Sequence, residues 1–213
     1  MAARAPNSVA ILPVTKGFPA TVLRPVAAAG FRVVGENRVD EAAAKIDVLS
    51  ELRMSVQMIG HLQRNKAAAA VRTFDRIDSV DSIRLASRLD SIVGEAGGGP
   101  LSILVQVNAS GEASKSGFPV GEAPEAVVQM SRYPHLAIRG LMTMAPFGAD
   151  DQTLHGVFGR TRECLDMCRR QVEGFEASEL SMGMSGDFAI AISEGATQVR
   201  LGTALLGERQ RWT

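Results

Sequence analysis

The sequence has few of the residues that build disulfide frameworks and metal sites. It contains two cysteines, Cys164 and Cys168, and three histidines. The cysteines are four positions apart in a segment with helical periodicity, where a disulfide is geometrically awkward and a zinc ion would lack further ligands. We therefore expect two buried thiols and no metal site. This cysteine usage is typical of a reducing compartment, and we predict a cytoplasmic protein.

The sequence also lacks an excess of charge of either sign and any long apolar run. Lysine plus arginine and aspartate plus glutamate number 23 each, so no overall field attracts nucleic acid or an acidic membrane surface. No stretch approaches the roughly 20 apolar residues of a membrane span. The apolar run near the N-terminus is short, is interrupted by Pro13 and fits a strand better than a signal sequence. We expect neither a nucleic acid nor a membrane as a partner.

Apolar, β-branched runs alternate with segments of helical spacing along the chain. The predicted helices cover residues 40–52, 65–74, 82–97, 123–133, 154–174 and 187–195. The predicted strands are Val9 to Thr15, Phe31 to Gly35, Val56 to Gly60, Arg76 to Ser79, Leu101 to Val107, Leu136 to Met144, Glu179 to Met184 and Gln198 to Thr203. Eight strands that alternate with helices imply parallel βαβ units, and eight such units close a barrel. We predict one α/β domain over residues 1–213, a (β/α)8 barrel of the TIM type.

The alternative fold is an open doubly wound sheet. That fold usually has a glycine-rich turn after its first strand, whereas the first predicted strand here ends in Thr15-Lys16-Gly17. Pro13 is one residue that argues against the barrel, because a closed barrel has no edge that excuses a missing backbone donor. We therefore expect a bulge or an irregular strand end at Pro13.

Barrels of this type place their active sites at the C-terminal ends of the strands, where Lys16 and two glycine-containing loops are predicted to lie. Ser185-Gly186 would open a helix after the seventh strand, and Gly202-Thr203 would close the eighth, where such barrels commonly bind phosphate. Lys16 at this end would lose solvation and become nucleophilic. A ligand with an aldehyde and a phosphate fits this combination. The alternative is a surface lysine, with glycine for a turn and Asp187 as an N-cap.

Two further residues bear on catalysis. His61 follows the third predicted strand and faces the same end of the barrel, where it would serve as a hydrogen-bonding residue or as a base. Tyr133, the only tyrosine, precedes the sixth strand and is predicted to lie on the opposite face.

Six segments of the chain carry a resemblance to a known family. They are PVTKGFP (13–19), GENRVDE (35–41), IGHLQRNK (59–66), VNASGEASKSGF (107–118), GLMTMAP (140–146) and LSMGMSGDFAIAISEGATQVRLGTALLG (180–207). With these motifs the chain resembles the YggS/PROSC family of pyridoxal 5′-phosphate (PLP) homeostasis proteins, from about Val9 to Arg209. The fold of that family is similar to the N-terminal domain of alanine racemases, so the resemblance implies the same barrel.

The resemblance also implies the roles of two basic residues. Lys16 would hold PLP as a Schiff base, because it occupies the family's lysine in the first motif. Arg200 is similar to the arginine that faces the pyridine nitrogen of the cofactor. An arginine in that place keeps the ring neutral, which makes it a poorer electron sink.

Five more residues are implied to lie in the PLP pocket. The resemblance makes phosphate contacts of Ser185, Gly202 and Thr203, and pocket residues of Asn37 and Ser181. It implies neither a catalytic residue nor a metal ligand. Family members usually carry a helix ahead of the first strand, and few residues precede that strand here, so we expect the entrance of the barrel to be less covered.

The function implied by the resemblance is intracellular PLP homeostasis by a protein that is not an enzyme. The implied partners are PLP and apo-enzymes that accept it, and we expect a monomer. The alternative is a PLP-dependent amino-acid racemase, which needs two bases on opposite faces of its substrate. Alanine racemases take the second base from a tyrosine of another domain, and we expect no such domain here. A third alternative, a scaffold without cofactor, leaves the combination of Lys16, Arg200 and the phosphate loops unexplained.

Overall fold

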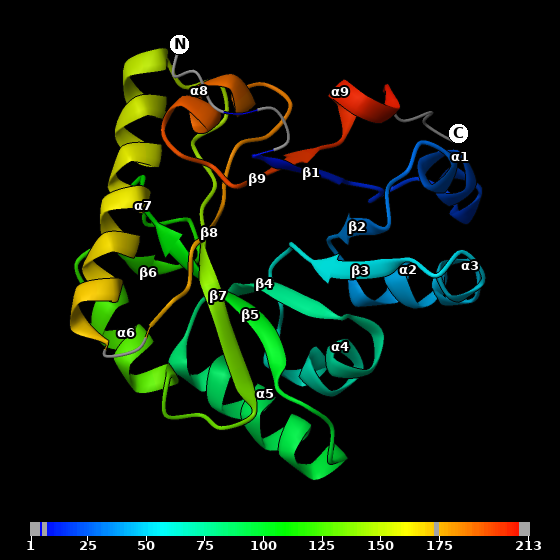
Figure 1. Cartoon of the computed structure of the whole chain (residues 1–213), viewed down its shortest axis with the longest axis horizontal. Coiled ribbons are helices and arrows are strands. Elements are labelled where there is room, and N and C mark those ends of the chain that lie inside the picture. The colour runs from blue at the N-terminus through cyan, green and yellow to red at the C-terminus, as the bar shows by residue number, and fades with distance from the viewer. Residues whose placement is uncertain (1–4, 6–7, 173–174, 209–213) are drawn as a thin grey trace.

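The computed structural model describes residue 5, residues 8–172 and residues 175–208. Eight parallel strands form a nearly closed barrel with helices on its outside, in the order β1, β9, β8, β7, β5, β4, β3, β2 (Figure 1). These strands are β1 (Ala10–Pro13), β2 (Val33–Glu36), β3 (Ser55–Met58), β4 (Arg76–Val80), β5 (Leu101–Asn108), β7 (Leu136–Met142), β8 (Glu179–Ser181) and β9 (Gln198–Leu201). The predicted (β/α)8 barrel is confirmed. Residues 1–4, 6–7 and 209–213 of the predicted domain lie outside the described residues.

The connections between the strands are mostly helical. The helices are α1 (Leu23–Ala28), α2 (Val39–Ala43), α3 (Ile46–Glu51), α4 (Ala67–Thr73), α5 (Ile83–Ala96), α6 (Ala123–Met130), α7 (Asp151–Gln171), α8 (Phe188–Ser193) and α9 (Thr203–Leu206). The single helix predicted over residues 40–52 is wrong, because this segment forms α2 and α3. A short strand that was not predicted, β6 (Phe118–Pro119), pairs with the end of β5. Residues 173–174 of the helix predicted over 154–174 lie outside the described residues.

Helix α7 shows how local sequence sets one of these helices. The Asp150 carboxylate accepts a hydrogen bond from the Thr153 backbone N–H at 2.7 Å, which caps the N-terminus. Its buried face includes Phe158, Cys164 and Cys168. Both thiols are free and buried, as predicted. A hydrogen bond with Cys168, together with burial, raises the pKa of the Cys164 thiol.

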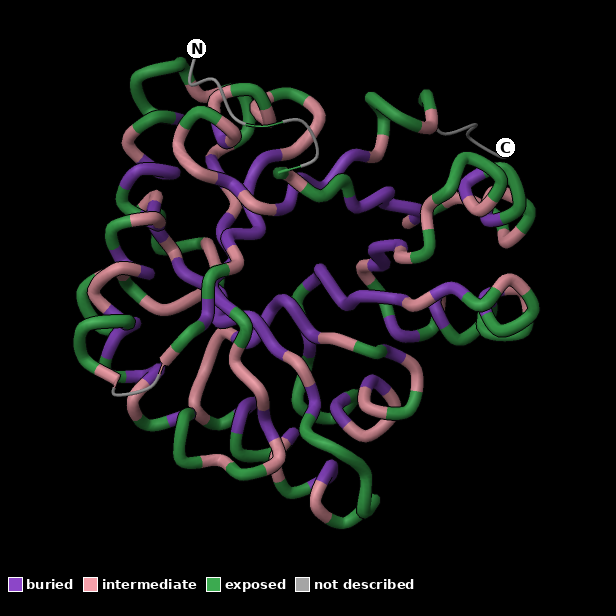
Figure 2. Tube along the Cα trace, in the orientation of Figure 1, coloured by how far each residue is buried: buried purple, intermediate pink, exposed green. Residues whose placement is uncertain are grey.

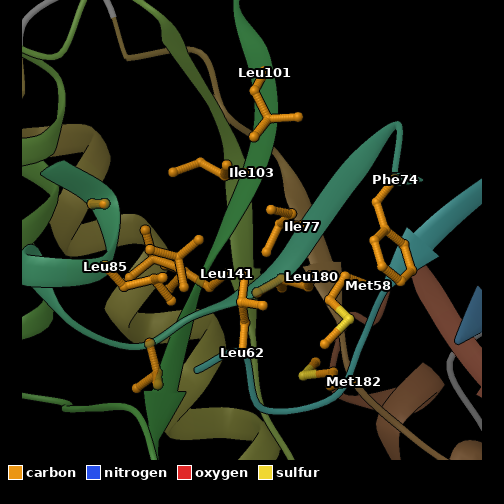
Figure 3. Close-up of a cluster of buried hydrophobic side chains, with 14 of the residues drawn as sticks. Met58, Leu62, Phe74, Ile77, Leu85, Leu101, Ile103, Leu141, Leu180 and Met182 are labelled. Carbon is orange, nitrogen blue, oxygen red and sulfur yellow. The ribbon is translucent and has the colours of Figure 1, made fainter. Parts of the chain in front are cut away.

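The main hydrophobic core lies between the strands and the helices outside them. Figure 2 shows buried positions along the strands and exposed positions on the outer turns of the helices. In Figure 3, Ile77 of β4, Ile103 of β5 and Leu141 of β7 lie close to Leu85 of α5, and all four belong to one buried cluster. Because strand residues alternate in direction, the neighbours of these apolar residues point into the barrel.

The inside of the barrel is polar near the N-terminal ends of the strands. Arg76 of β4 pairs with Asp78 at 2.6 Å and, across the barrel, with Glu179 of β8 at 2.5 Å. Arg76 also donates a hydrogen bond to the Gln57 side chain of β3 at 3.2 Å. Burial raises the pKa of the Asp78 carboxyl, and the positive charge of Arg76 acts in the opposite direction. Side chains from strands that are not neighbours can meet in this way only inside the barrel.

The barrel closes least completely between β1 and β2. One isolated bridge, Val14 with Gly35, joins them. The Ala10 N–H donates to the carbonyl of the residue before β9 at 2.8 Å, and the Val14 N–H donates to the last residue of β9 at 2.9 Å. Because direction alternates along a strand, the nitrogen of Pro13 faces β2. β1 ends at Pro13, which agrees with the irregular strand end that the sequence predicted. We call this incomplete junction the β1–β2 seam.

Candidate functional site

A cavity of about 750 Å³ lies at the C-terminal ends of the strands. Its walls come from the segments that follow β1, β2, β3, β7, β8 and β9. Of the residues selected from the sequence, those that line it are Lys16, Asn37, Ser185, Arg200, Gly202 and Thr203. One loop end of the barrel therefore brings together residues that are up to 187 positions apart in the sequence, from Lys16 to Thr203 (203 − 16).

Lys16 lies on a turn directly after β1. The Phe18 N–H donates to the Thr15 carbonyl at 3.1 Å, and Gly17 has a φ of 72°, a backbone conformation that glycine adopts readily. Side chains hold the peptide groups on both sides of Lys16. Lys45 Nζ donates to the Thr15 carbonyl at 2.8 Å, and the Gly17 N–H donates to the Glu41 carboxylate at 3.0 Å.

A buried ion pair supports the same turn from across the β1–β2 seam. Lys45 Nζ lies 2.5 Å from Glu36 Oε1, and the two side chains are 6% and 0% exposed. The Thr15 hydroxyl donates to the same Glu36 oxygen at 2.6 Å. We call Thr15, Glu36 and Lys45 the seam clamp. It joins the two strands through side chains beside their single backbone bridge.

Arg200 of β9 forms part of the cavity floor. The side chain donates to the Ser181 carbonyl at 2.6 Å, to Ser181 Oγ at 2.9 Å and to the Thr143 carbonyl at 2.8 Å. Burial lowers the pKa of the guanidinium to about 10, against the opposing effects of Asp78 and Asp187. Arg200 is therefore still a cation at neutral pH, and it is fixed in direction.

Ser181 differs from the other selected residues because it does not line the cavity. It is fully buried on β8 and lies behind the Arg200 guanidinium, to which it offers two oxygens. A contact between Ser181 and a ligand in the cavity is therefore not what this geometry favours. Its position instead suits a residue that holds Arg200.

The loops after β8 and β9 meet at one side of the cavity. Ser185 Oγ accepts a hydrogen bond from the Ala204 N–H at 3.2 Å, which joins the two loops. The Asp187 carboxylate accepts from the Met184 N–H at 2.5 Å, within the loop that precedes α8. Asp187 makes no side-chain capping bond to α8, so its position at the N-cap does not account for the residue type.

Asn37 is placed by a close approach of two loops. A Cβ at Gly60 would lie 2.3 Å from the Asn37 carbonyl oxygen, which is far below any real contact. Only glycine therefore allows the loop after β3 to pack on the loop after β2. His61, the next residue, lines the cavity and lies 3.0 Å from Asp81 through Nδ1, with its side chain 57% exposed.

The sequence alone did not identify the apolar wall of the cavity. This wall includes Phe18, Ile59, Met144, Phe147 and Leu154. Phe147 stands out because it is completely exposed. Three of these residues, Phe18, Ile59 and Met144, are in motifs that carried the family resemblance, but the motifs did not indicate that they line the cavity.

Two structural findings bear on the kind of site this is. Within the described ranges, no group of three or more histidine, cysteine, aspartate or glutamate residues could hold a metal ion. In the same part of the chain, no helix has both the length and the apolar character needed to cross a bilayer.

Comparison with known proteins shows the family to which the chain belongs. The family described as "Alanine racemase, N-terminal domain" matches residues 1–210. A pyridoxal phosphate homeostasis protein of Pseudomonas aeruginosa is 41% identical over 209 residues, which cover 98% of this chain and 88% of that protein. The solved structure of PipY from Synechococcus elongatus without PLP has a TM-score of 0.90 at 40% identity and covers 96% of this chain and 95% of PipY. For PipY with PLP bound, the TM-score is 0.87 at 39% identity, with the same coverage. The chain belongs to the pyridoxal phosphate homeostasis proteins, within the alanine racemase N-terminal domain family.

Proposed function

We propose that this protein binds PLP in the cavity as a Schiff base on Lys16 and serves in PLP homeostasis in the cytoplasm without catalysing a reaction. The observation that carries the proposal is the gathering of Lys16, Arg200 and the Ser185 and Gly202-Thr203 loops around one cavity. The relative PipY has been solved with PLP bound, at an identity that makes a shared ligand the simplest expectation. We further propose that residues 1–213 form one domain, that the protein is a monomer, and that apo-enzymes accept PLP from it.

The residues of the cavity fit the parts of PLP. When bound, PLP supplies an aldehyde that reacts reversibly with an amine, and a ring that can withdraw electrons. Lys16 offers the amine on a turn whose backbone is fixed from both sides. Ser185, Gly202 and Thr203 offer small side chains where two loops meet, which is the setting in which backbone N–H groups approach a phosphate. Asn37 completes the pocket from the loop after β2.

Arg200 bears on how well the bound ring could stabilise a carbanion. A fixed cation that faces the pyridine nitrogen disfavours protonation of that nitrogen, because like charges repel. An unprotonated ring withdraws electrons less strongly and stabilises carbanions less well. Alanine racemases share this feature, so Arg200 does not by itself separate a carrier from a racemase.

The side chains that could act as a second base separate a carrier from a racemase more directly. Tyr133 lies just before β7, at the end of the barrel opposite the cavity, and packs against the main core. His61 lines the cavity, which keeps a racemase with a lysine and a histidine base as the second candidate. Its hydrogen bond to Asp81 and its exposure equally suit a residue that only shapes the cavity mouth.

The test of the proposal is chemical trapping. Purified protein is incubated with PLP, its visible absorbance is recorded, and the mixture is reduced with borohydride and mapped by peptide mass. We expect a PLP adduct on the peptide that contains Lys16 and none on the exposed Lys66, which serves as an internal comparison. In Lys16→Ala the fold should be intact and the adduct lost, because Lys16 lies on a turn and not in the core. An undiminished adduct in Lys16→Ala would remove Lys16 from this role.

A further inference from the structure

Arg200 is a buried cation that is held only by neutral oxygens. Its three hydrogen bonds go to two backbone carbonyls and the Ser181 hydroxyl, and the residue is 4% exposed. Among the carboxylates that the structure describes, none forms an ion pair with it. A buried charge without a counter-charge is strongly unfavourable. Asp78 and Asp187 stabilise this charge without direct contact, so the hydrogen bonds that fix the guanidinium come from neutral groups.

One amide connects the holder of Arg200 to a carboxylate. Gln198 and Ser181 are register partners on the adjacent strands β9 and β8. Gln198 Nε2 donates both to Ser181 Oγ at 3.1 Å and to Asp78 Oδ2 at 3.3 Å. Its Oε1 accepts from Arg76 Nη2 at 3.2 Å. With a cation on one side and a carboxylate on the other, only one orientation of the amide satisfies both neighbours.

The orientation of the Gln198 amide determines whether Ser181 Oγ accepts or donates a hydrogen bond. Ser181 Oγ receives hydrogen bonds from Gln198 Nε2 and from Arg200 Nη1, so both of its lone pairs are used as acceptors. Hydrogen bonds in such a chain polarise one another. These hydrogen bonds connect four charged groups: the guanidinium groups of Arg76 and Arg200 and the carboxylates of Asp78 and Glu179. Their formal charges cancel.

We propose that Gln198 is a positioning residue for the PLP site: its amide links Ser181, which holds Arg200, to the Asp78–Arg76 ion pair inside the barrel. Gln198 does not line the cavity, and it acts on the bound group only through Arg200. The inference rests on the proposed function where PLP is concerned. Its structural part, the fixing of Arg200, is a property of the protein without PLP.

The chain offers a matched control for Gln198. Gln57 of β3 also accepts a hydrogen bond from Arg76 Nη2 at 3.2 Å, and both glutamines are buried. Within the residues that the structure describes, Gln57 makes no hydrogen bond to Ser181 or Asp78. Gln57→Met and Gln198→Met therefore remove the same kind of group from the same arginine, but only Gln198→Met breaks the link to Arg200.

The first measurement uses the protein without PLP. Arginine is labelled with ¹⁵N, the Arg200 side-chain signals are assigned with Arg200→Lys, and exchange of the guanidinium protons is followed. We expect Arg200 exchange to be at least about tenfold faster in Gln198→Met than in the wild type, because its acceptor is no longer fixed. In Gln57→Met, Arg200 exchange should be unchanged. Equal rates in the two variants would overturn the proposal.

The second measurement adds PLP. Affinity and the pH at which the spectrum of the bound chromophore changes are compared in the same proteins. We expect Gln198→Met to bind PLP several-fold more weakly, with a displaced pH transition, and Gln57→Met to match the wild type. A wild-type protein that binds no PLP would refute the proposed function. A wild type that binds PLP with a spectrum and affinity identical to those of Gln198→Met would refute only the role of Gln198.

A double-mutant cycle tests the route through Ser181. If Gln198 acts through this hydroxyl, Gln198→Met should have no further effect on Arg200 exchange in the background of Ser181→Ala. Additive effects would mean that Gln198 acts by another route. Should Gln198→Met not fold, Gln198→Asn takes its place, because it keeps an amide that is too short to reach Ser181 and Asp78 together. In Gln198→Asn, the guanidinium protons of Arg200 should then exchange at least about tenfold faster than in the wild type. Exchange at the wild-type rate would overturn the proposal.

Discussion

Lys16 and Arg200 both line the cavity, and contacts from other segments hold each of them in place. For Lys16 the backbone is fixed, since the carbonyl before it and the N–H after it are bound by Lys45 and Glu41. For Arg200 the side chain itself is fixed by three acceptors. The contacts around Lys16 thus fix where its side chain begins, and those of Arg200 fix where its charge lies.

At the residue scale, Ser185→Asp tests where the phosphate of PLP lies. We predict that PLP binds at least about tenfold more weakly, a change of about 1.4 kcal/mol, because the new carboxylate lies beside a phosphate dianion. Ser178→Asp is the matched control, since it adds the same charge to an exposed residue just before β8, at the other end of the barrel. Affinity is measured by titration of the absorbance of bound PLP. Equal affinities in the two variants would mean that the phosphate lies elsewhere.

At the element scale, the seam clamp joins β1 to β2 where the backbone does so only once. Glu36 has one carboxylate oxygen bound by both Thr15 and Lys45, while the other, Oε2, is buried without a hydrogen-bond partner in the described protein. The carboxylate thus depends on Lys45 for its counter-charge. Removal of one partner from such a buried pair is far more costly than removal of both.

Lys45→Met is therefore predicted to destabilise the protein by about 3 kcal/mol or more, which is a fall in melting temperature of about 6 °C or more. The double variant Lys45→Met with Glu36→Met should recover much of that loss, because no buried charge is left unpaired. Lys66→Met is the control: its pair with Asp40 is exposed, and we expect a change of less than about 1 kcal/mol. Thermal unfolding followed by circular dichroism gives all three values. A Lys45→Met protein as stable as Lys66→Met would contradict the role of the clamp.

The strands of the barrel were predictable from the sequence because each is an apolar run with turn residues at its ends. The ends themselves were less so: the first strand was predicted from Val9 to Thr15 and spans Ala10–Pro13. The helix predicted over residues 40–52 divides at Lys45, whose burial against Glu36 no local pattern reveals. Helix α1 was missed because its six residues include Pro25.

The cavity residues could be selected from motifs, but their supports could not. Ser181 was assigned to the pocket by its motif, whereas the structure places it behind Arg200. Arg76 and Glu179 are 103 positions apart and meet only because β4 and β8 face each other across the barrel. Such contacts depend on closure of the whole sheet, which periodicity along the chain does not encode.

At the scale of the whole molecule, the barrel has a ligand cavity at one end and a charged interior at the other. The one tyrosine is at the charged end and the one histidine of the cavity is His61. We predict that the protein with PLP bound, incubated with L-alanine in D2O, exchanges the α-proton no faster than free PLP does. NMR of the amino acid gives the rate of α-proton exchange, and chiral analysis of the products gives the rate of racemisation. Rapid exchange that is lost in His61→Ala would instead identify a racemase with a lysine and a histidine base.

The incomplete seam also has a consequence for how molecules of this protein meet one another. A barrel that lacks a ladder at one junction is a curled sheet with two edge strands, here β1 and β2, and exposed edges invite pairing with strands of other chains. Each edge strand is only four residues long, and Pro13 removes a donor from the open side of β1. Short edges and an edge proline are the devices by which soluble β-proteins avoid aggregation. Pro13, which offers no donor at the seam, therefore also makes intermolecular strand pairing less favourable.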